Sequence, residues 1–162
     1  MYEKILVPLD GSELAECSLE HVKKIASGEG APEVILLRVV ELITPNEALP
    51  WVQANYTIAE VQTRRREQAK EYLDLAVENL RKSGISAYGE AVEGRPAETI
   101  MEYARSHQID LIVISSHGRS GIARWALGSV ADRIIRHSSV PTLLISAPGC
   151  RIENPQVMAG KP

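Results

Sequence analysis

The segment after the most apolar run of the chain carries the residue types best suited to binding chemistry. Two glycines, three serines, a histidine and an arginine stand together there: Ser115, Ser116, His117, Gly118, Arg119, Ser120 and Gly121. Further along, Gly128 and Ser129 begin an expected helix whose first turn contains Val130 and Ala131. Glycines let backbone N–H groups approach an anion closely, and the free amides of a helix N-terminus carry the positive end of its dipole. Hydroxyl and guanidinium groups add donors. This pattern favours a phosphate group as ligand.

Residue types alone leave a second interpretation open, in which a glycine-bearing loop precedes a helix that Ser129 simply caps. Two familiar phosphate motifs are absent, since the chain contains no GxxxxGK[ST] loop and no GxGxxG after its first expected strand. The sequence therefore excludes a P-loop enzyme and an ordinary dinucleotide-binding domain.

Short apolar runs alternate with longer segments of helical period, which is typical of βαβ units around a parallel sheet. We expect strands at 4–9, 34–40, 85–92, 111–114 and 141–145, with the third near a sheet edge. We expect helices at about 12–27 and 59–83, and from 96 and 128 onward, and a loop or partly helical insertion at 41–57. The leading architecture is a doubly wound α/β sheet, whose ligands bind at the carboxyl ends of its strands. Those ends follow Leu9, Val40 and Ile114.

Composition narrows the classes of function. The chain has 162 residues, of which 44% are hydrophobic and 24% charged, as in an ordinary single globular domain. A net charge of −3 gives no electrostatic reason to bind nucleic acid or anionic lipid. No apolar run is long enough to span a membrane, the start lacks the pattern of a signal peptide, and we expect a cytoplasmic protein. The two cysteines, Cys17 and Cys150, form neither a CxxC pair nor a metal-ligand spacing.

The stretch VISSHGRSGIARWALGSVADRIIRHSSVPTLLI, together with KILVPLDGSE, VILLRVV and EGRPAETI, resembles the universal stress protein family. The resemblance covers residues 2–146, so we expect one domain at 1–146 and a flexible tail at 147–162. It implies an adenine-nucleotide-binding, Rossmann-like fold with five parallel strands in the order 3-2-1-4-5. ATP-binding members carry a glycine, two residues, a glycine, nine residues and then Gly-Ser or Gly-Thr. Gly118 and Gly128-Ser129 fit that spacing, whereas Ser115 replaces the first glycine. Its side chain could crowd a ribose or hydrogen-bond to it.

By the same resemblance, Pro8, Leu9, Asp10 and Val39 line an adenosine pocket. Residues 115–121 then surround the ribose and phosphates, and residues 128–131 donate to the β and γ phosphates. A magnesium ion would be carried on the phosphates, with no metal site made by the protein itself. We predict no catalytic residue, because an Asp-Gly turn such as Asp10-Gly11 is commonly only turn chemistry.

The resulting hypothesis is an ATP-binding regulatory or stress-response protein whose turnover of ATP is slow or nil. Two alternatives stay open: a slow ATPase or nucleotidyl-transfer enzyme on the same fold, and a nucleotide-free interaction protein in which Ser115 marks a lost pocket. The fifth strand is an apolar edge in the implied strand order, and the resemblance implies a homodimer formed by two such strands. The protein partner and the choice among ATP, AMP and a cyclic nucleotide are not determined by the sequence.

Overall fold

The computed structural model describes residues 2–28, 31–116 and 127–146. These residues form a five-stranded, wholly parallel sheet in the order β3-β2-β1-β4-β5. The elements in chain order are β1 (Lys4–Pro8), α1 (Glu13–Ala26), β2 (Glu33–Val40), α2 (Pro45–Gln53), α3 (Ile58–Lys82), β3 (Ala87–Glu93), α4 (Pro96–Ser106), β4 (Leu111–Ser115), α5 (Ser129–His137) and β5 (Thr142–Ile145). The predicted fold class and strand order are confirmed.

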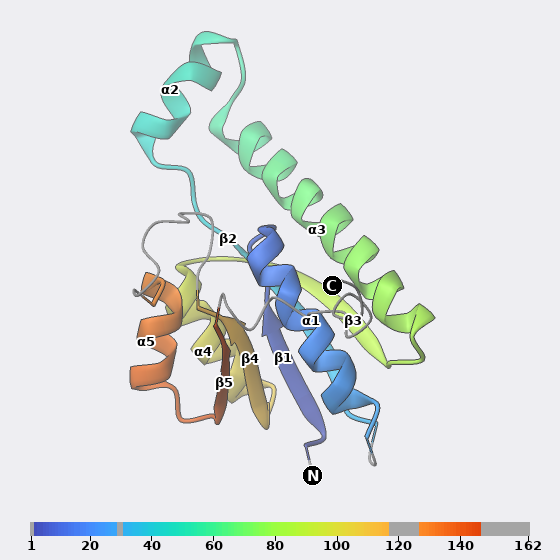
Figure 1. The fold of residues 1–162 in the computed structure, drawn as a ribbon. Coiled ribbons are helices and arrows are strands. Elements are labelled where there is room, and N and C mark those ends of the chain that lie inside the picture. Colours follow the sequence, from blue (N-terminus) through green and yellow to red (C-terminus); the bar gives the residue numbers. More distant parts are fainter. Residues whose placement is uncertain (1, 29–30, 117–126, 147–162) are drawn as a thin grey trace, which may run out of the picture.

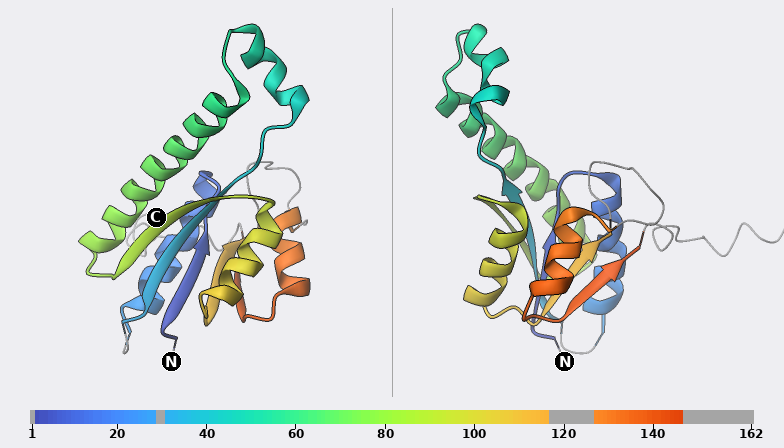
Figure 2. Two further views of the ribbon diagram at one scale, coloured as in Figure 1. Left: turned by 180° about the vertical axis from the view of Figure 1, so that it is seen from behind. Right: turned by 90° about the vertical axis from the view of Figure 1, so that its left-hand side faces the viewer.

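Helices cover both faces of the sheet, as Figures 1 and 2 show. The α1 and α3 helices pack against one face, where Leu19, Val22 and Leu73 join a buried apolar cluster with β1 and β2. The α4 and α5 helices pack against the other face, where Ile100 and Ile134 join a second cluster. Because both faces of the central strands are covered, most residues of β1, β2 and β4 are buried.

The segment expected as a loop or partly helical insertion contains one clear helix, α2. Thr44 and Glu47 form a capping box at its start, and Thr57 and Glu60 form another at the start of α3. In each box the threonine accepts from a backbone N–H, and the glutamate accepts from the threonine's own backbone N–H, which specifies a helix N-terminus. The backbone hydrogen bonds also lower the pKa of both glutamates.

The α2 helix and the first turns of α3 project beyond the carboxyl ends of the strands, as Figure 1 shows. Exposed apolar side chains lie on this projection, among them Leu49, Trp51 and Tyr56. The expected edge position of the third strand is confirmed, since β3 lies at one end of the sheet. Within the described ranges, no helix has the length and apolar character needed to cross a membrane.

Candidate functional site

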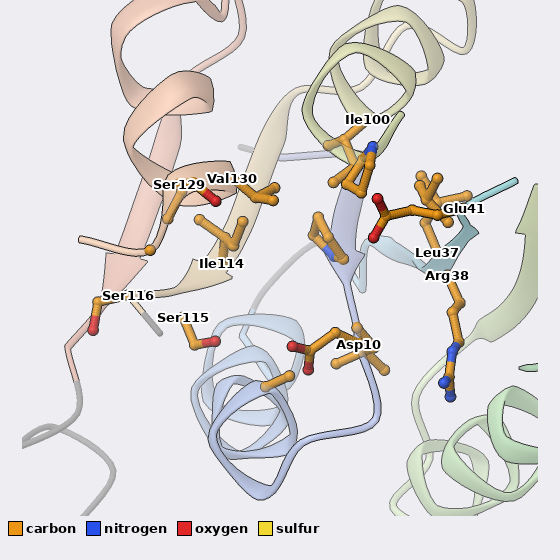
Figure 3. Close-up of a pocket in the computed structure, with 17 residues that line it drawn as sticks. Asp10, Leu37, Arg38, Glu41, Ile100, Ile114, Ser115, Ser116, Ser129 and Val130 are labelled. Carbon is orange, nitrogen blue, oxygen red and sulfur yellow. The ribbon is translucent and has the colours of Figure 1, made fainter. Parts of the chain in front are cut away.

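A cavity of about 320 Å³ lies at the carboxyl ends of β1, β2 and β4, beside the start of α5 (Figure 3). This volume falls in the range of small-molecule sites. The lining residues come from five segments that are far apart in the sequence: Pro8, Leu9, Asp10, Ala15, Leu37, Arg38, Val39, Glu41, Pro96, Ile100, Ile114, Ser115, Ser116, Gly128, Ser129, Val130 and Ala131. The cavity therefore occupies the position at which doubly wound sheets bind their ligands.

The turn that follows β1 holds Asp10 at the lining of the cavity. Its Oδ1 accepts from the backbone N–H of Ser12 at 3.0 Å and from the Ser12 hydroxyl at 2.6 Å. The Ser12 hydroxyl in turn accepts from the backbone N–H of Ala15 at 3.1 Å and caps α1. Figure 3 shows the Asp10 carboxylate and the Ser115 hydroxyl pointing toward one another. This arrangement presents an oriented acceptor group at the pocket floor.

The Arg38 guanidinium lies close to Gly11 in the same turn. Gly11 has a φ of +83°, and a Cβ added there would lie 2.9 Å from the Arg38 Nη1. The guanidinium carbon lies 5.0 Å from the centre of the Tyr72 ring on α3, in a cation–π contact. Burial raises the pKa of the Tyr72 phenol far above its ordinary value, with Arg38 acting in the opposite direction, so the ring stays neutral. Arg38 thus connects α3 to the Asp10 turn, and Figure 3 shows its guanidinium directed away from the pocket.

The opposite end of the cavity is formed where β4 and α5 meet. The Gly128 N–H donates to the Ser116 carbonyl at 2.5 Å, and the Gly128 carbonyl accepts from the Asp132 N–H at 2.9 Å, which closes the first turn of α5. Ser115 and Ser116 are 8% and 5% exposed. The N-terminus of α5, with the Ser129 hydroxyl, is therefore tied to Ser116 and borders the same cavity as Ser115. Backbone amides at such a helix start favour an anionic ligand.

Apolar side chains form the walls between these two ends. Leu37 and Val39 come from β2, Ile100 from α4 and Ile114 from β4. Leu37, Ile100 and Ile114 are buried, whereas Val39 is partly exposed to the cavity. A flat apolar group such as a purine ring suits a space of this kind, and the charged and polar groups at the ends would fix its orientation.

The structure brings most of the expected site residues together. Those that line the one cavity are Pro8, Leu9, Asp10, Val39, Ser115, Ser116, Gly128, Ser129, Val130 and Ala131. The remaining expected residues, His117, Gly118, Arg119, Ser120 and Gly121, lie outside the described residues. Sequence reasoning missed the other seven lining residues: Ala15, Leu37, Arg38, Glu41, Pro96, Ile100 and Ile114. Among these, Glu41 directly follows β2 and Pro96 begins the helix after β3. Their places at strand ends were the available signal.

The model of the universal stress protein family matches residues 1–146. The chain belongs to the universal stress protein family. One curated relative, a universal stress protein of Methanocaldococcus jannaschii, is 33% identical over 148 residues, which cover 91% of this chain and 84% of the relative. A solved structure of another Methanocaldococcus jannaschii protein superposes with a TM-score of 0.77 at 33% identity, covering 90% of this chain and 96% of that one. The universal stress protein of Lactobacillus plantarum gives a TM-score of 0.74 at 28% identity, covering 88% of this chain and 97% of that one.

Adenine nucleotides occur in other structures of this family. One universal stress protein has been solved in complex with cAMP, and a family member of Arabidopsis thaliana has been solved with AMP bound. Their identities to this universal stress protein are 23% and 17%, each with a TM-score of 0.60, so the likeness to this chain is one of fold.

Proposed function

We propose that this protein binds ATP in the cavity between β1, β2, β4 and α5, and that the bound nucleotide regulates its shape or its partners, with slow or no turnover. The observation that carries the proposal is the convergence of Asp10, Ser115 and the start of α5 on one cavity with apolar walls. A ribose hydroxyl can donate to Asp10, a base can lie against Val39, and phosphates can accept from the amides at Ser129 and Val130. Adenine nucleotides in two relatives support the same ligand class.

Ser115 supports binding in place of the motif glycine. Its side chain borders the cavity, which keeps a volume of about 320 Å³ with the serine present. Figure 3 shows its hydroxyl on the side of Asp10, where a ribose bound by that carboxylate would lie. The serine therefore acts as an additional hydrogen-bonding group toward the sugar.

We propose that magnesium binds together with ATP, through the phosphates of the nucleotide. Mg²⁺ keeps several waters and is usually bound through substrate phosphates, so the phosphate oxygens of ATP would carry it. Within the part of the chain that the structure describes, no group of three or more His, Cys, Asp or Glu side chains could hold a metal ion. Magnesium should accordingly tighten binding of ATP far more than binding of adenosine, which calorimetry with and without the ion can measure.

The first experiment is to denature freshly purified protein and separate the released nucleotides by anion exchange. The emptied protein is then titrated with Mg-ATP by calorimetry. Released ATP or ADP together with saturable binding supports the proposal. An empty supernatant and a flat titration would contradict it and favour the nucleotide-free interaction protein. Phosphate or pyrophosphate release that scales with protein concentration and is lost in a site variant would instead favour the enzyme.

We also propose a homodimer in which two β5 strands pair antiparallel across a two-fold axis. The β5 strand ends the sheet order, and its Leu143 side chain is 37% exposed. An uncovered apolar edge strand is an aggregation hazard, which pairing would remove. Light scattering at micromolar concentration should give twice the monomer mass, and Leu143→Lys should give the monomer mass. A monomeric native protein would contradict the dimer.

A further inference from the structure

Glu41 borders the candidate nucleotide pocket at the end away from α5. It directly follows β2, and its carboxylate points into the pocket in Figure 3, on the side opposite Ser129. Sequence reasoning did not select this residue. Within the described residues, neither carboxylate oxygen of Glu41 makes a hydrogen bond or an ion pair. A charged acceptor group therefore faces the pocket and has bonding capacity left for a ligand.

The backbone around Glu41 is held in place, although its side chain is exposed. The Gln62 side chain of α3 donates through Nε2 to the Glu41 carbonyl at 3.5 Å and accepts through Oε1 from the Ile43 N–H at 3.3 Å. The preceding Val40 carbonyl accepts from the Gly94 N–H at 3.2 Å. Contacts from α3 and from the end of β3 thus fix the point from which the Glu41 side chain enters the pocket.

The two ends of the pocket differ in charge, and this difference orients a nucleotide. The N-terminus of α5 carries the positive end of the helix dipole, whereas Glu41 carries a negative charge. Phosphates are attracted to the first and repelled by the second. The base of a nucleotide must then lie at the Glu41 end, between apolar side chains such as Val39 and Ile100.

We infer that Glu41 is a specificity-determining residue, which accepts a hydrogen bond from the exocyclic amino group of an adenine base. This inference rests on the proposed binding of ATP. A carboxylate has only acceptor atoms, so it pairs with the N6 amino group of adenine. It repels a purine that presents a carbonyl oxygen at that position. Because one partner is charged, the hydrogen bond is stronger than one between neutral groups.

The test compares two ligands on two proteins. Purine riboside triphosphate is ATP without its amino group, and Glu41→Ala removes the carboxylate. On the native protein, ATP should bind about fivefold to tenfold more tightly than purine riboside triphosphate, as expected for a partly solvated charged hydrogen bond. On Glu41→Ala that ratio should fall to about twofold or less, with the loss confined to ATP. Glu41→Gln keeps an acceptor oxygen without the charge and should give an intermediate ratio.

Glu20→Ala is the matched control, since Glu20 lies exposed on α1, pairs with Lys23 and does not line the pocket. Its ligand ratio should equal that of the native protein. An unchanged ratio on Glu41→Ala would overturn the inference while ATP binding itself stands. GTP binding more tightly than ATP would also overturn it, because a carboxylate can pair with the N1 and N2 donors of guanine. Failure of the native protein to bind any of these nucleotides would overturn both proposals.

Discussion

The β1 strand lies between two aspartates whose surroundings differ. At its amino end, Asp110 uses Oδ2 to accept from the backbone N–H groups of Glu3 and Lys4, both at 2.9 Å. These backbone hydrogen bonds lower the pKa of the Asp110 carboxyl. At the carboxyl end of the strand, Asp10 accepts from Ser12 and borders an open cavity. One aspartate connects β1 to the start of β4, and the other faces the site where we place the ligand.

The difference follows from the direction of the strands. In a parallel sheet every strand begins at one edge and ends at the other, so the loops that precede helices gather at the carboxyl edge. A polar group at the amino edge can make only structural hydrogen bonds, as Asp110 does with Glu3 and Lys4. Asp10 combines a structural bond within its turn with a position on the cavity. We therefore expect substitution of Asp10 to weaken nucleotide binding. Substitution of Asp110 should lower the free energy of unfolding and leave nucleotide binding unchanged.

The largest expected effect comes from Asp10→Ala. This change removes the acceptor that we assign to the ribose, and ATP binding should weaken at least tenfold, or about 1.4 kcal/mol. Calorimetric titration with Mg-ATP measures the change in Kd. Asp10→Asn keeps the size of the side chain and one acceptor oxygen, so it should retain the Ser12 turn and lose less affinity. Native affinity in both variants would remove Asp10 from the proposed site.

Gly11→Ala is expected to have a smaller effect, on both stability and affinity. Its φ of +83° strains any residue with a Cβ, and the new carbon would lie 2.9 Å from Arg38 Nη1. We expect a loss of about 1 kcal/mol in the free energy of unfolding, measured in urea, because the backbone conformation is disfavoured for alanine. ATP binding should also weaken, by less than in Asp10→Ala, because the shifted turn moves Asp10.

Gly84→Ala is the matched control for Gly11→Ala. Gly84 has a φ of +79°, and a Cβ there would meet nothing within 4 Å. It follows α3 and lies outside the pocket lining. The variant should lose a similar free energy of unfolding and keep the native Kd for ATP. Equal losses of affinity in both variants would show that the Gly11 effect is one of general stability.

The sheet and most of the cavity could be predicted because they depend on local sequence. Apolar runs such as 34–40 and 111–114 identify buried strands. Alternation with helices predicts parallel connections, and the Gly128-Ser129 pair marks the start of α5. The carboxyl edge then follows from strand direction. For these reasons the strand ends after Leu9, Val40 and Ile114 could be placed at one edge of the sheet from the sequence, whereas the individual pocket residues followed from the family resemblance.

The features that the sequence did not predict depend on tertiary contacts. Two prolines within 41–57 favoured an irregular segment, yet Pro45 fits the first turn of α2 and Pro50 is accommodated within it. The position of Arg38 beneath Gly11 depends on how β2, α1 and α3 pack together. Glu41 could be placed at the end of β2, but not the direction of its side chain into the pocket. Neither residue type nor spacing carries that information.

Asp110→Ala should have the smallest effect, and it tests whether Asp110 contributes to stability alone. The variant leaves the N–H groups of Glu3 and Lys4 without their protein acceptor. Because these groups are near the surface and can bind water, we expect a loss of about 0.5 to 1 kcal/mol in the free energy of unfolding at pH 7. The Kd for ATP should be unchanged, since Asp110 lies at the opposite edge of the sheet from the cavity.

The pH dependence of the free energy of unfolding tests whether the charge of Asp110 causes the loss of stability in Asp110→Ala. Its carboxyl has a lower pKa in the folded chain than its ordinary value of 3.8, so its contribution is fully present above that value. The contribution disappears as the pH falls through the folded pKa. Urea unfolding in a pH series should therefore show the native protein and Asp110→Ala converging in acid. A difference that stays constant with pH would assign the effect to packing, and Asp110 would then no longer stand as the structural counterpart of Asp10.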